Sequence, residues 1–251
     1  MSTFLLLTVT GVGLAAMYFL IASGLSLIYG LMGVLNFAHG AFITVGSYAT
    51  WWMSDNVFDG VGSAWIRFLV SALCGLAAGA IFAALVELVL IRPLYQRHIE
   101  QVLVTVGLSL ATIALVQGIW GNDARTYAVP GWVEHTTSFG GASVPNDRWL
   151  AIGGIAAALA GVLSGVYYTT IDPNQGTSLL IFAFIVVVIG GLGSITGSAI
   201  AAVVVGLLQQ YANYYGTNWI GDWGLGDLSV LLLLAAVLLV RPRGLAGAVT
   251  A

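Results

Sequence analysis

The chain has 251 residues, of which 59% are hydrophobic and only 7% are charged, and its mean hydropathy is +1.00. A soluble domain carries roughly 25% charged residues, so this composition excludes an ordinary soluble protein. The formal net charge is −3 and the seven basic residues, all arginine, are scattered, which excludes a basic patch for nucleic acid. Composition alone therefore predicts an integral membrane protein.

About seven apolar runs of bilayer-crossing length follow one another, at 5–33, 37–53, 66–91, 102–120, 149–168, 179–212 and 228–240. They predict an all-α integral membrane protein, a polytopic bundle of about seven transmembrane helices in one membrane domain over residues 1–251. No basic residue precedes the first run as it would in a signal peptide, so we expect this run to remain as a span.

The run 179–212 is too long for one plain helix, and a glycine-rich segment interrupts it. Glycine permits the positive φ of a turn, so we predict a helix break at Gly190, Gly191, Gly193 and Ser194. Elsewhere, small residues four positions apart predict close helix packing and no site. These are Gly75 and Gly79, Gly161 and Gly165, Gly193 and Gly197, and Ser198, Ala202 and Gly206.

The loops carry a charge bias that predicts orientation. The loop 54–65 holds Asp55 and Asp59 and no basic partner, whereas basic residues gather in the loop 92–101 and at the C-terminal end. The positive-inside rule then places 92–101 and the C-terminus in the cytoplasm, and the N-terminus and 54–65 outside. The long loop 121–148, expected to have modest structure, also falls outside. The loop 213–226 reads as an outer interfacial belt with Tyr214, Tyr215, Trp219 and Trp223.

A polar pair interrupts the apolar stretch Gly24–Gly46 at Asn36 and His39. Polar groups at membrane depth need partners inside the protein. We expect Asn36 to cap a helix that begins near Phe37 by accepting from a first-turn backbone N–H. For His39 two interpretations remain open, a hydrogen bond to another helix or a place on a polar pathway. The simplest interpretation of the stretch is a capped break between two spans.

Few other polar side chains lie within the predicted spans. Thr105, Ser109 and Thr112 share one helical face, where they either line a pathway or bond back to their own helix. Glu87 is expected to pair with Arg92 near the cytoplasmic end, the alternative being a pathway carboxylate. We interpret Arg67, at a span edge, as an anchor that reaches the interface. The single cysteine, Cys74, is expected to be a buried packing residue.

Enzymatic chemistry has no residues to carry it. The three histidines fall on different segments, and the sequence contains neither HExxH nor Gly-x-Ser-x-Gly. No lysine is present for a Walker A loop, so any ATP hydrolysis would belong to another chain. We predict no catalytic residues, no metal site and no cofactor.

The run SLIYGLMGVLNFAHG, which ends in Asn36, Phe37, Ala38, His39 and Gly40, resembles the signature of the permease subunit of branched-chain amino-acid-type ABC importers. Four more stretches resemble the same family in the expected order. They are ELVLIRPL with Glu87, Arg92 and Pro93, the span opening around TVGLSLA, GGLGSITG from Gly190 to Gly197, and RPRGL with Arg241 and Pro242.

The resemblance implies a multi-pass permease subunit of the bacterial inner membrane that moves branched-chain amino acids or a related small polar solute. Its expected partners are the lipid bilayer, a homologous second permease, cytoplasmic ABC ATPase subunits and a periplasmic solute-binding protein. The signature and the stripe Thr105, Ser109 and Thr112 would then belong to the transport pathway. No predicted span carries a charged clamp for an amino-acid carboxylate or ammonium.

One departure stands against this resemblance. In the family the outer loop is followed by a span, a cytoplasmic loop whose short helix docks on the ATPase, and another span. Here residues 146–149 run almost directly into 156–165, which resembles the later span, so one span and the coupling loop are missing. The alternative function is therefore a coupling-deficient, permease-like membrane protein with a structural or regulatory role.

The missing span also changes the parity of the crossings. In the family the equivalent of 172–178 lies outside, but a single crossing at 149–168 would deliver it inside. Either 179–212 crosses once with a break, or 149–168 is re-entrant. On the sequence alone we favour the single broken crossing.

Overall fold

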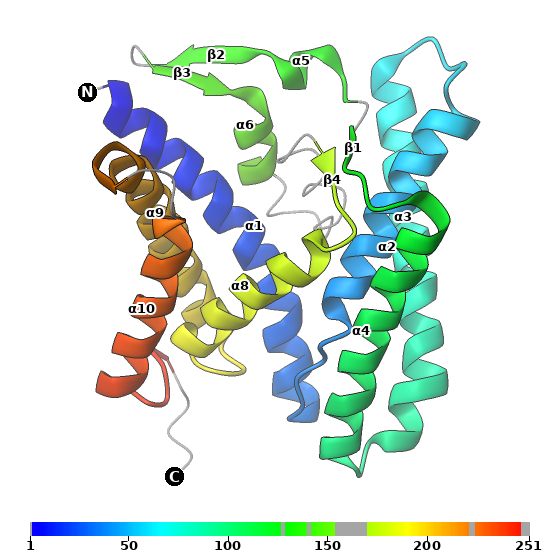
Figure 1. Cartoon of the computed structure of the whole chain (residues 1–251), viewed down its shortest axis with the longest axis vertical. Helices are drawn as coiled ribbons and strands as arrows, with labels where there is room; N and C mark the ends of the chain where they lie inside the picture. Colours follow the sequence, from blue (N-terminus) through cyan, green and yellow to red (C-terminus); the bar gives the residue numbers. More distant parts are fainter. Residues whose placement is uncertain (1, 127–128, 140–141, 154–169, 221–223, 247–251) are drawn as a thin grey trace. The chain divides into compact units, whose positions relative to one another are not determined.

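The computed structural model describes residues 2–126, 129–139, 142–153, 170–220 and 224–246. Most of them are helical and the few strands are short, which confirms the all-α prediction (Figure 1). The chain forms two compact units. The first contains Met1–Gly33, Thr136–Ala158 and Ile181–Ala251, and the second contains Val34–His135 and Leu159–Leu180.

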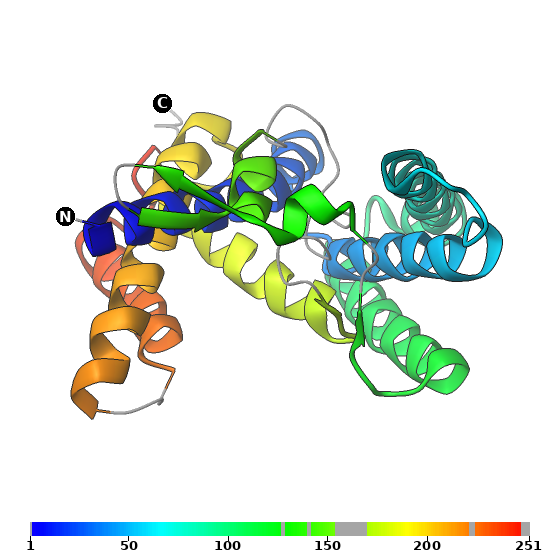
Figure 2. The same cartoon turned by 90° about the horizontal axis from the view of Figure 1, so that it is seen from above.

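The first unit is built on three helices, α1 (Ser2–Met32), α9 (Ile195–Ile220) and α10 (Leu225–Val240). α1 packs along α9, and α10 packs on α9, as the blue and orange helices of Figure 2 show. The hairpin of β2 (Thr136–Phe139) and β3 (Ala142–Pro145), followed by α6 (Asn146–Gly153), lies against α1. This hairpin, with the short helix α5 before it, confirms that the loop 121–148 has modest structure.

The second unit is built on α2 (His39–Trp52), α3 (Ala64–Val86) and α4 (His98–Trp120), with α2 packed on both of the others. Short π and 3₁₀ turns extend two of these helices, Met53–Val57 after α2 and Glu87–Leu94 after α3. The remaining elements are α5 (Gly131–Glu134), β1 (Arg125–Thr126) and β4 (Thr170–Ile171). α8 (Gln175–Gly190) begins in this unit and ends in the first.

The small residues predicted to pack helices do so where α2 meets α3. A Cβ placed on Gly75 would lie 1.8 Å from Thr50 Oγ1 and 2.6 Å from the carbonyl oxygen of Gly46. In a bilayer, where burial of apolar area gives little preference for one helix contact over another, such close backbone approach is a main source of helix association.

Four helical stretches of the described chain are long and apolar enough to cross a membrane, Thr3–Leu31, Ala64–Leu94, His98–Trp120 and Ile195–Thr217. α8 and α10 are apolar but shorter. Large apolar side chains are exposed on several of these helices. Examples are Leu73 of α3, Leu110 of α4 and Leu232 of α10, each more than 60% exposed. Such surfaces suit a hydrocarbon solvent or another membrane subunit. Cys74 is only half-buried, so its predicted burial is wrong for this chain by itself.

The predicted break in the run 179–212 is confirmed. α8 ends at Gly190, α9 begins at Ile195, and the chain changes direction between them (Figure 1). Gly191 and Gly193 have φ of 101° and 82°, the positive values that favour glycine. Gly193 therefore lies in the turn and is not part of a helix-packing pair with Gly197.

Two further expectations from the sequence are wrong. α9 continues to Ile220, so Tyr214 and Tyr215 belong to a helix and the predicted loop 213–226 begins too early. In addition, β1 pairs antiparallel with β4, Arg125 opposite Ile171 and Thr126 opposite Thr170. Hydrogen-bonded strands share one side of a membrane, so a single crossing cannot separate 121–148 from 172. Most of the predicted span 149–168 lies outside the described residues.

Candidate transport pathway

The signature turn, Asn36–Gly40, follows the end of α1 and leads into α2. Gly33, with φ of 68°, ends α1 by donating its N–H to the carbonyl oxygen of Tyr29 over 2.8 Å. Asn36 is buried, and its Oδ1 accepts from the N–H of Ala38 at 3.0 Å. This hydrogen bond closes a turn before α2, which begins at His39 with Ala38 at its N-cap and no side-chain cap, so the expected capping of a helix near Phe37 by Asn36 is wrong. A buried side-chain amide thus satisfies backbone at the point where two helices meet.

The polar stripe of α4 lies beside this turn. Thr105, Ser109 and Thr112 are all buried. Thr105 Oγ1 accepts from the N–H of Phe37 at 3.3 Å and donates to the carbonyl oxygen of Val102 at 2.9 Å. Thr112 bonds back to its own helix, as one of the two interpretations expected. The structure brings the signature turn and the stripe together, and packs the stripe inside the second unit.

His39 differs from Asn36 because its Nδ1 has no hydrogen-bond partner among the residues that the structure describes. Within the described ranges, its buried Nδ1 makes no hydrogen bond, and its ring lies edge-on to Phe42 with centroids 6.2 Å apart. The residue as a whole is half-buried. No hydrogen bond to another helix is present, which leaves the pathway interpretation as a proposal.

The signature turn is braced by the start of α8, which belongs to the same unit. A Cβ on Gly40 would lie 2.6 Å from the carbonyl oxygen of Gly176, and a Cβ on Gly176 would lie 2.1 Å from that of Gly40. Thr44 Oγ1 donates to the carbonyl oxygen of Gly40 at 3.3 Å and approaches that of Pro173 at 3.5 Å. This backbone contact leaves no room for a Cβ, which explains why residue 40 is a glycine.

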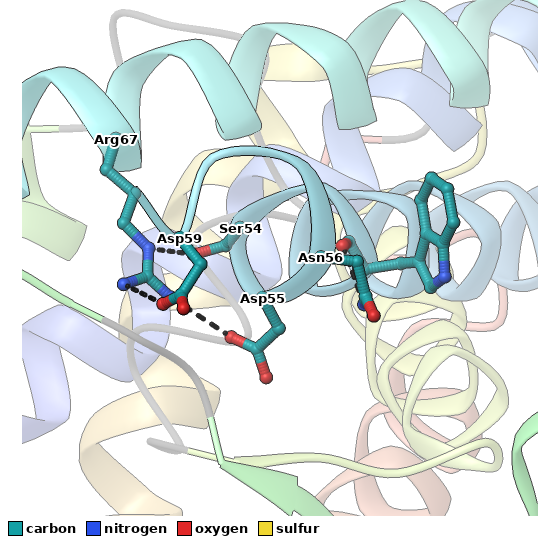
Figure 3. A network of polar contacts seen from close by, with 6 residues as sticks. Ser54, Asp55, Asn56, Asp59 and Arg67 are labelled. Atoms are coloured by element: carbon teal, nitrogen blue, oxygen red, sulfur yellow. Dashed lines mark hydrogen bonds and ion pairs between the residues drawn. The ribbon is translucent and has the colours of Figure 1, made fainter. Parts of the chain in front are cut away.

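The acidic loop 54–65 has a basic partner, contrary to the prediction. Arg67 donates to Ser54 Oγ at 3.0 Å and forms ion pairs with Asp55 at 3.4 Å and Asp59 at 3.0 Å (Figure 3). The three oxygen acceptors come from the connection between α2 and α3, and Arg67 comes from the first turn of α3. Arg67 therefore has protein groups as its partners, and its expected role as an anchor at the membrane interface stays a prediction.

Glu87 also has a different partner from the one expected. No ion pair joins Glu87 to Arg92 in the described part of the chain. Instead the Tyr95 hydroxyl donates to the Glu87 carboxylate. This hydrogen bond raises the pKa of the Tyr95 hydroxyl above its ordinary value. The turn with Arg92 and Pro93 is closed by this contact between a carboxylate and a phenol.

The C-terminal turn closes the end of α8. The N–H groups of Leu245 and Ala246 donate to the carbonyl oxygens of Ile189 and Gly190, at 2.7 and 2.9 Å. These carbonyls are free because α8 ends there. Gly244 makes the approach possible with φ of 76°. The glycine-rich stretch 190–197 and the arginine–proline stretch 241–245 both resemble the family and are far apart in sequence. In the first unit they lie together, joined by these hydrogen bonds.

Sequence reasoning missed a polar chain across the first unit. The Tyr18 hydroxyl of α1 donates to Gln209 Oε1 of α9 at 2.7 Å, and Gln209 Nε2 donates to Asp227 Oδ1 of α10 at 2.7 Å. Tyr18 and Gln209 are buried. A glutamine inside an apolar helix was the available signal. Asp227 lies in the first turn of α10.

Replacing Gln209 by leucine is expected to destabilise the protein by about 2 kcal/mol, because a buried hydroxyl and a carboxylate both lose their partner. Gln210→Leu, one position along the same helix, is the matched control and should be near neutral, since Gln210 is less buried than Gln209 and is not part of this chain of hydrogen bonds among the residues that the structure describes. Unfolding of the purified chain in detergent, followed by circular dichroism, measures both. Equal losses in the two variants would contradict a role for the chain of hydrogen bonds.

Among the residues described, no three of His, Cys, Asp and Glu gather to hold a metal ion.

Comparison with known proteins gives a consistent result. The chain is 25% identical to the high-affinity branched-chain amino acid transport system permease protein LivH of Escherichia coli K12, over 94% of this chain and 93% of the relative. It is 26% identical to BraD of Pseudomonas aeruginosa, over 95% and 94%. A shorter match, 37% identity over 91 residues and 34% of this chain, joins it to LsrD, an autoinducer 2 import system permease of Yersinia enterocolitica. No solved structure matches.

The alignment to LivH spans 298 positions, whereas 94% of 251 residues supplies roughly 236, so about 60 positions have no counterpart in this chain. Sixty residues are enough for one span of about 20 residues and a sizeable loop. The family description "branched-chain amino acid transport system / permease component" matches in two pieces, residues 7–149 and 148–241. The pieces meet where the sequence predicts the missing span. Since the two pieces together cover most of the sequence, the chain belongs to the family of permease components of branched-chain amino acid transport systems.

Proposed function

We propose that this chain is a permease subunit of an ABC importer in the bacterial inner membrane, carrying branched-chain amino acids or a related small polar solute. The observation that carries the proposal is the match to the family along residues 7–241, including a signature turn built by buried hydrogen bonds. A homologous second permease completes the pathway, a periplasmic binding protein delivers solute, and separate ATPase subunits hydrolyse ATP.

The proposed pathway runs past the signature turn. In this proposal Asn36 and Gly40 stabilise the backbone of the turn, and the side chains of Phe37 and His39 face the pathway. The stripe on α4 supplies neutral hydrogen-bonding groups beside the turn, from Thr105, Ser109 and Thr112. Alternating access then consists of shifts between inward-open and outward-open states, biased by ATP in the partner chains. The break at Gly190, Gly191, Gly193 and Ser194, tied to the turn at Arg241 and Pro242, supplies a flexible joint that such a shift needs.

The β1–β4 pairing supports a specific membrane topology. If 121–126 and 170–172 share the outer side, α8 enters the membrane, the glycine break returns the chain, and α9 and α10 complete the count. With α1 to α4 this gives about seven crossings, the N-terminus outside and the C-terminus inside, in accord with the positive-inside rule. Of the two options that the parity of the crossings left open, this topology is the one that the sequence alone did not favour.

Cysteine labelling in intact cells tests this topology. In a Cys74→Ala background, Asn174→Cys is expected to react with an impermeant maleimide from outside, because Asn174 is exposed beside β4. Leu192→Cys, exposed in the helix break, should react only after the membrane is opened. Asp59→Cys and Glu100→Cys serve as outer and inner references. Labelling of Leu192→Cys in intact cells would refute the reversal at the break.

Co-purification tests the function itself. The tagged chain, in mild detergent, is expected to bring down the second permease and the ATPase encoded with it, and the assembled complex in proteoliposomes should take up leucine when ATP and binding protein are supplied. An ATPase that comes with the chain must contact a surface other than the family's coupling loop, and the turn 92–101 is the first candidate. Recovery of the second permease without the ATPase would instead favour the coupling-deficient alternative.

A further inference from the structure

The second unit contains an arginine held among aromatic rings at the end of its helices. Arg125, on β1, lies over the ring of Trp51, with its guanidinium carbon 5.3 Å from the ring centroid. Its Nη2 donates to the carbonyl oxygen of Trp120 at 2.7 Å. The ring of Tyr48 lies between the two tryptophans, 6.2 Å from Trp51 and 5.4 Å from Trp120. One aromatic ring and one backbone carbonyl thus position the cation beside a cluster of three aromatic side chains.

Two polar atoms in this cluster are buried without a partner in the described structure. They are the Tyr48 hydroxyl oxygen and Arg125 Nε. Buried polar groups are nearly always hydrogen-bonded, so an unsatisfied hydroxyl and an unsatisfied guanidinium N–H in one cluster call for an explanation. Both groups can donate, which makes a bound anion, and a carboxylate in particular, the matching chemistry.

A carboxylate of the protein lies nearby and does not neutralise the arginine. The pairing of β1 with β4 brings Asp172 next to Arg125, since Ile171 is the partner of Arg125 in the ladder. The charges of Asp172 and Arg125 both act on Tyr48. Yet no ion pair joins Asp172 to Arg125 among the residues that the structure describes. One oxygen of Asp172 accepts from the N–H of Asn174 at 2.7 Å. Two opposite charges therefore stand close together and unpaired.

We propose that Arg125, Tyr48 and Asp172 form a binding site for the zwitterion of an α-amino acid. Arg125 and the Tyr48 hydroxyl hold the carboxylate, Asp172 holds the ammonium group, and the rings of Trp51 and Trp120 contact the apolar side chain. An amino acid bridges the unpaired charges and satisfies the two orphan donors at once. This inference rests on the proposed function and adds to it the residues that would recognise an amino-acid solute, at the side of the membrane where the loop 121–148 lies.

The predicted spans contain no such clamp, and this site does not need one. Arg125 lies on the short strand β1, outside the helices long enough to cross a membrane, and Asp172 directly follows β4, so neither charge has to be buried in the hydrocarbon. A charged clamp at the mouth of a pathway can select the solute, while neutral groups such as the stripe on α4 let it pass. The zwitterion would then bind close to bulk water, where the free energy needed to remove water from its charges is lower than inside the hydrocarbon.

Equilibrium binding to the purified full-length chain in lipid nanodiscs tests the site. The probes are leucine, 3-methylbutanoate, which lacks the ammonium, and 3-methylbutylamine, which lacks the carboxylate. Leucine is expected to bind at least about tenfold more tightly than either analogue, since each charge-assisted contact contributes on that scale. Arg125→Gln should weaken leucine and 3-methylbutanoate about tenfold or more and leave 3-methylbutylamine unchanged. Asp172→Asn should show the opposite selectivity between the two analogues, and Tyr48→Phe a smaller loss for both carboxylates.

Arg97→Gln is the matched control, because Arg97 pairs with Glu100 on an exposed surface. The Arg97→Gln variant should bind all three probes as the unmodified chain does. Arg125→Lys retains the charge and guards against a fold defect in Arg125→Gln. Leucine binding unchanged in Arg125→Gln and Tyr48→Phe, with ATP-driven leucine uptake intact in the assembled importer, would overturn the site and leave the proposed function standing. Failure of the chain to co-purify with any permease or ATPase would count against the proposed function, whatever the binding result.

Discussion

Replacing Gly176 by alanine is expected to destabilise the second unit by at least about 2 kcal/mol and to reduce transport sharply. The new Cβ would lie 2.1 Å from the carbonyl oxygen of Gly40 and 2.3 Å from Thr44 Oγ1. Overpacking costs about 1–3 kcal/mol, and the upper end applies here because the neighbour is backbone, which cannot rotate away. α8 must therefore move off α2, and the signature turn loses its brace.

A matched glycine separates this clash from a general effect of alanine. Gly107 lies inside α4 with no described atom within 4 Å of its Cβ position. Gly107→Ala should be neutral or stabilising by up to about 1 kcal/mol, since alanine favours helix more than glycine does. Gly40→Ala, which meets the carbonyl oxygen of Gly176 at 2.6 Å, should resemble Gly176→Ala. Thermal unfolding in detergent and uptake by the assembled importer measure the four proteins. Gly176→Ala with unchanged stability would show that the two helices do not meet as described.

The second large effect is expected at Gly244, where alanine should cost about 3 kcal/mol. Its φ of 76° imposes roughly 1–2 kcal/mol of strain on a residue with a Cβ. That Cβ would also lie 2.6 Å from the carbonyl oxygen of Val188 and 2.7 Å from the backbone nitrogen of Gly191. The C-terminal turn must then leave the end of α8, and the carbonyls of Ile189 and Gly190 lose their donors.

Gly33→Ala isolates the strain from the clash. Gly33 has a similar φ of 68°, but none of the described atoms lies within 4 Å of its Cβ position, so only about 1 kcal/mol is expected. Limited trypsin digestion reports on the turn directly. Cleavage after Arg243 should be faster in Gly244→Ala than in Gly33→Ala or the unmodified chain, because only Gly244→Ala releases the segment. Equal cleavage rates would mean that the turn does not close on α8.

The break at Gly190–Ser194 and a local hydrogen bond of the Asn36 side chain could be predicted because both depend on neighbouring residues, although that amide closes a turn before α2 and does not cap the helix. Glycine is the residue that tolerates positive φ, and a side-chain amide two positions before a backbone N–H forms its hydrogen bond locally. The shared face of Thr105, Ser109 and Thr112 is likewise a consequence of helix period. Composition alone predicted an integral membrane protein, because it is a sum over residues and does not depend on tertiary contacts.

What failed involved partners distant in sequence. Charge and spacing suggested Arg92 as the partner of Glu87, and the fold supplied Tyr95; the acidic loop 54–65 found Arg67 on the next helix. The sequence favoured a single crossing between the loop 121–148 and residue 172, but the pairing of Arg125 with Ile171 joins residues far apart in the chain. No periodicity or propensity encodes such a pairing.

From the residues alone one can recognise an α-helical membrane protein that resembles the permease family, the approximate position of most of its described helices, and the glycine break between α8 and α9, because composition, periodicity and turn propensity are local properties. The fold was needed to show which polar groups meet, Phe37 with Thr105, and Tyr18 with Gln209 and Asp227. In an apolar solvent each buried polar group must find a partner, and the one it finds depends on how the helices cross.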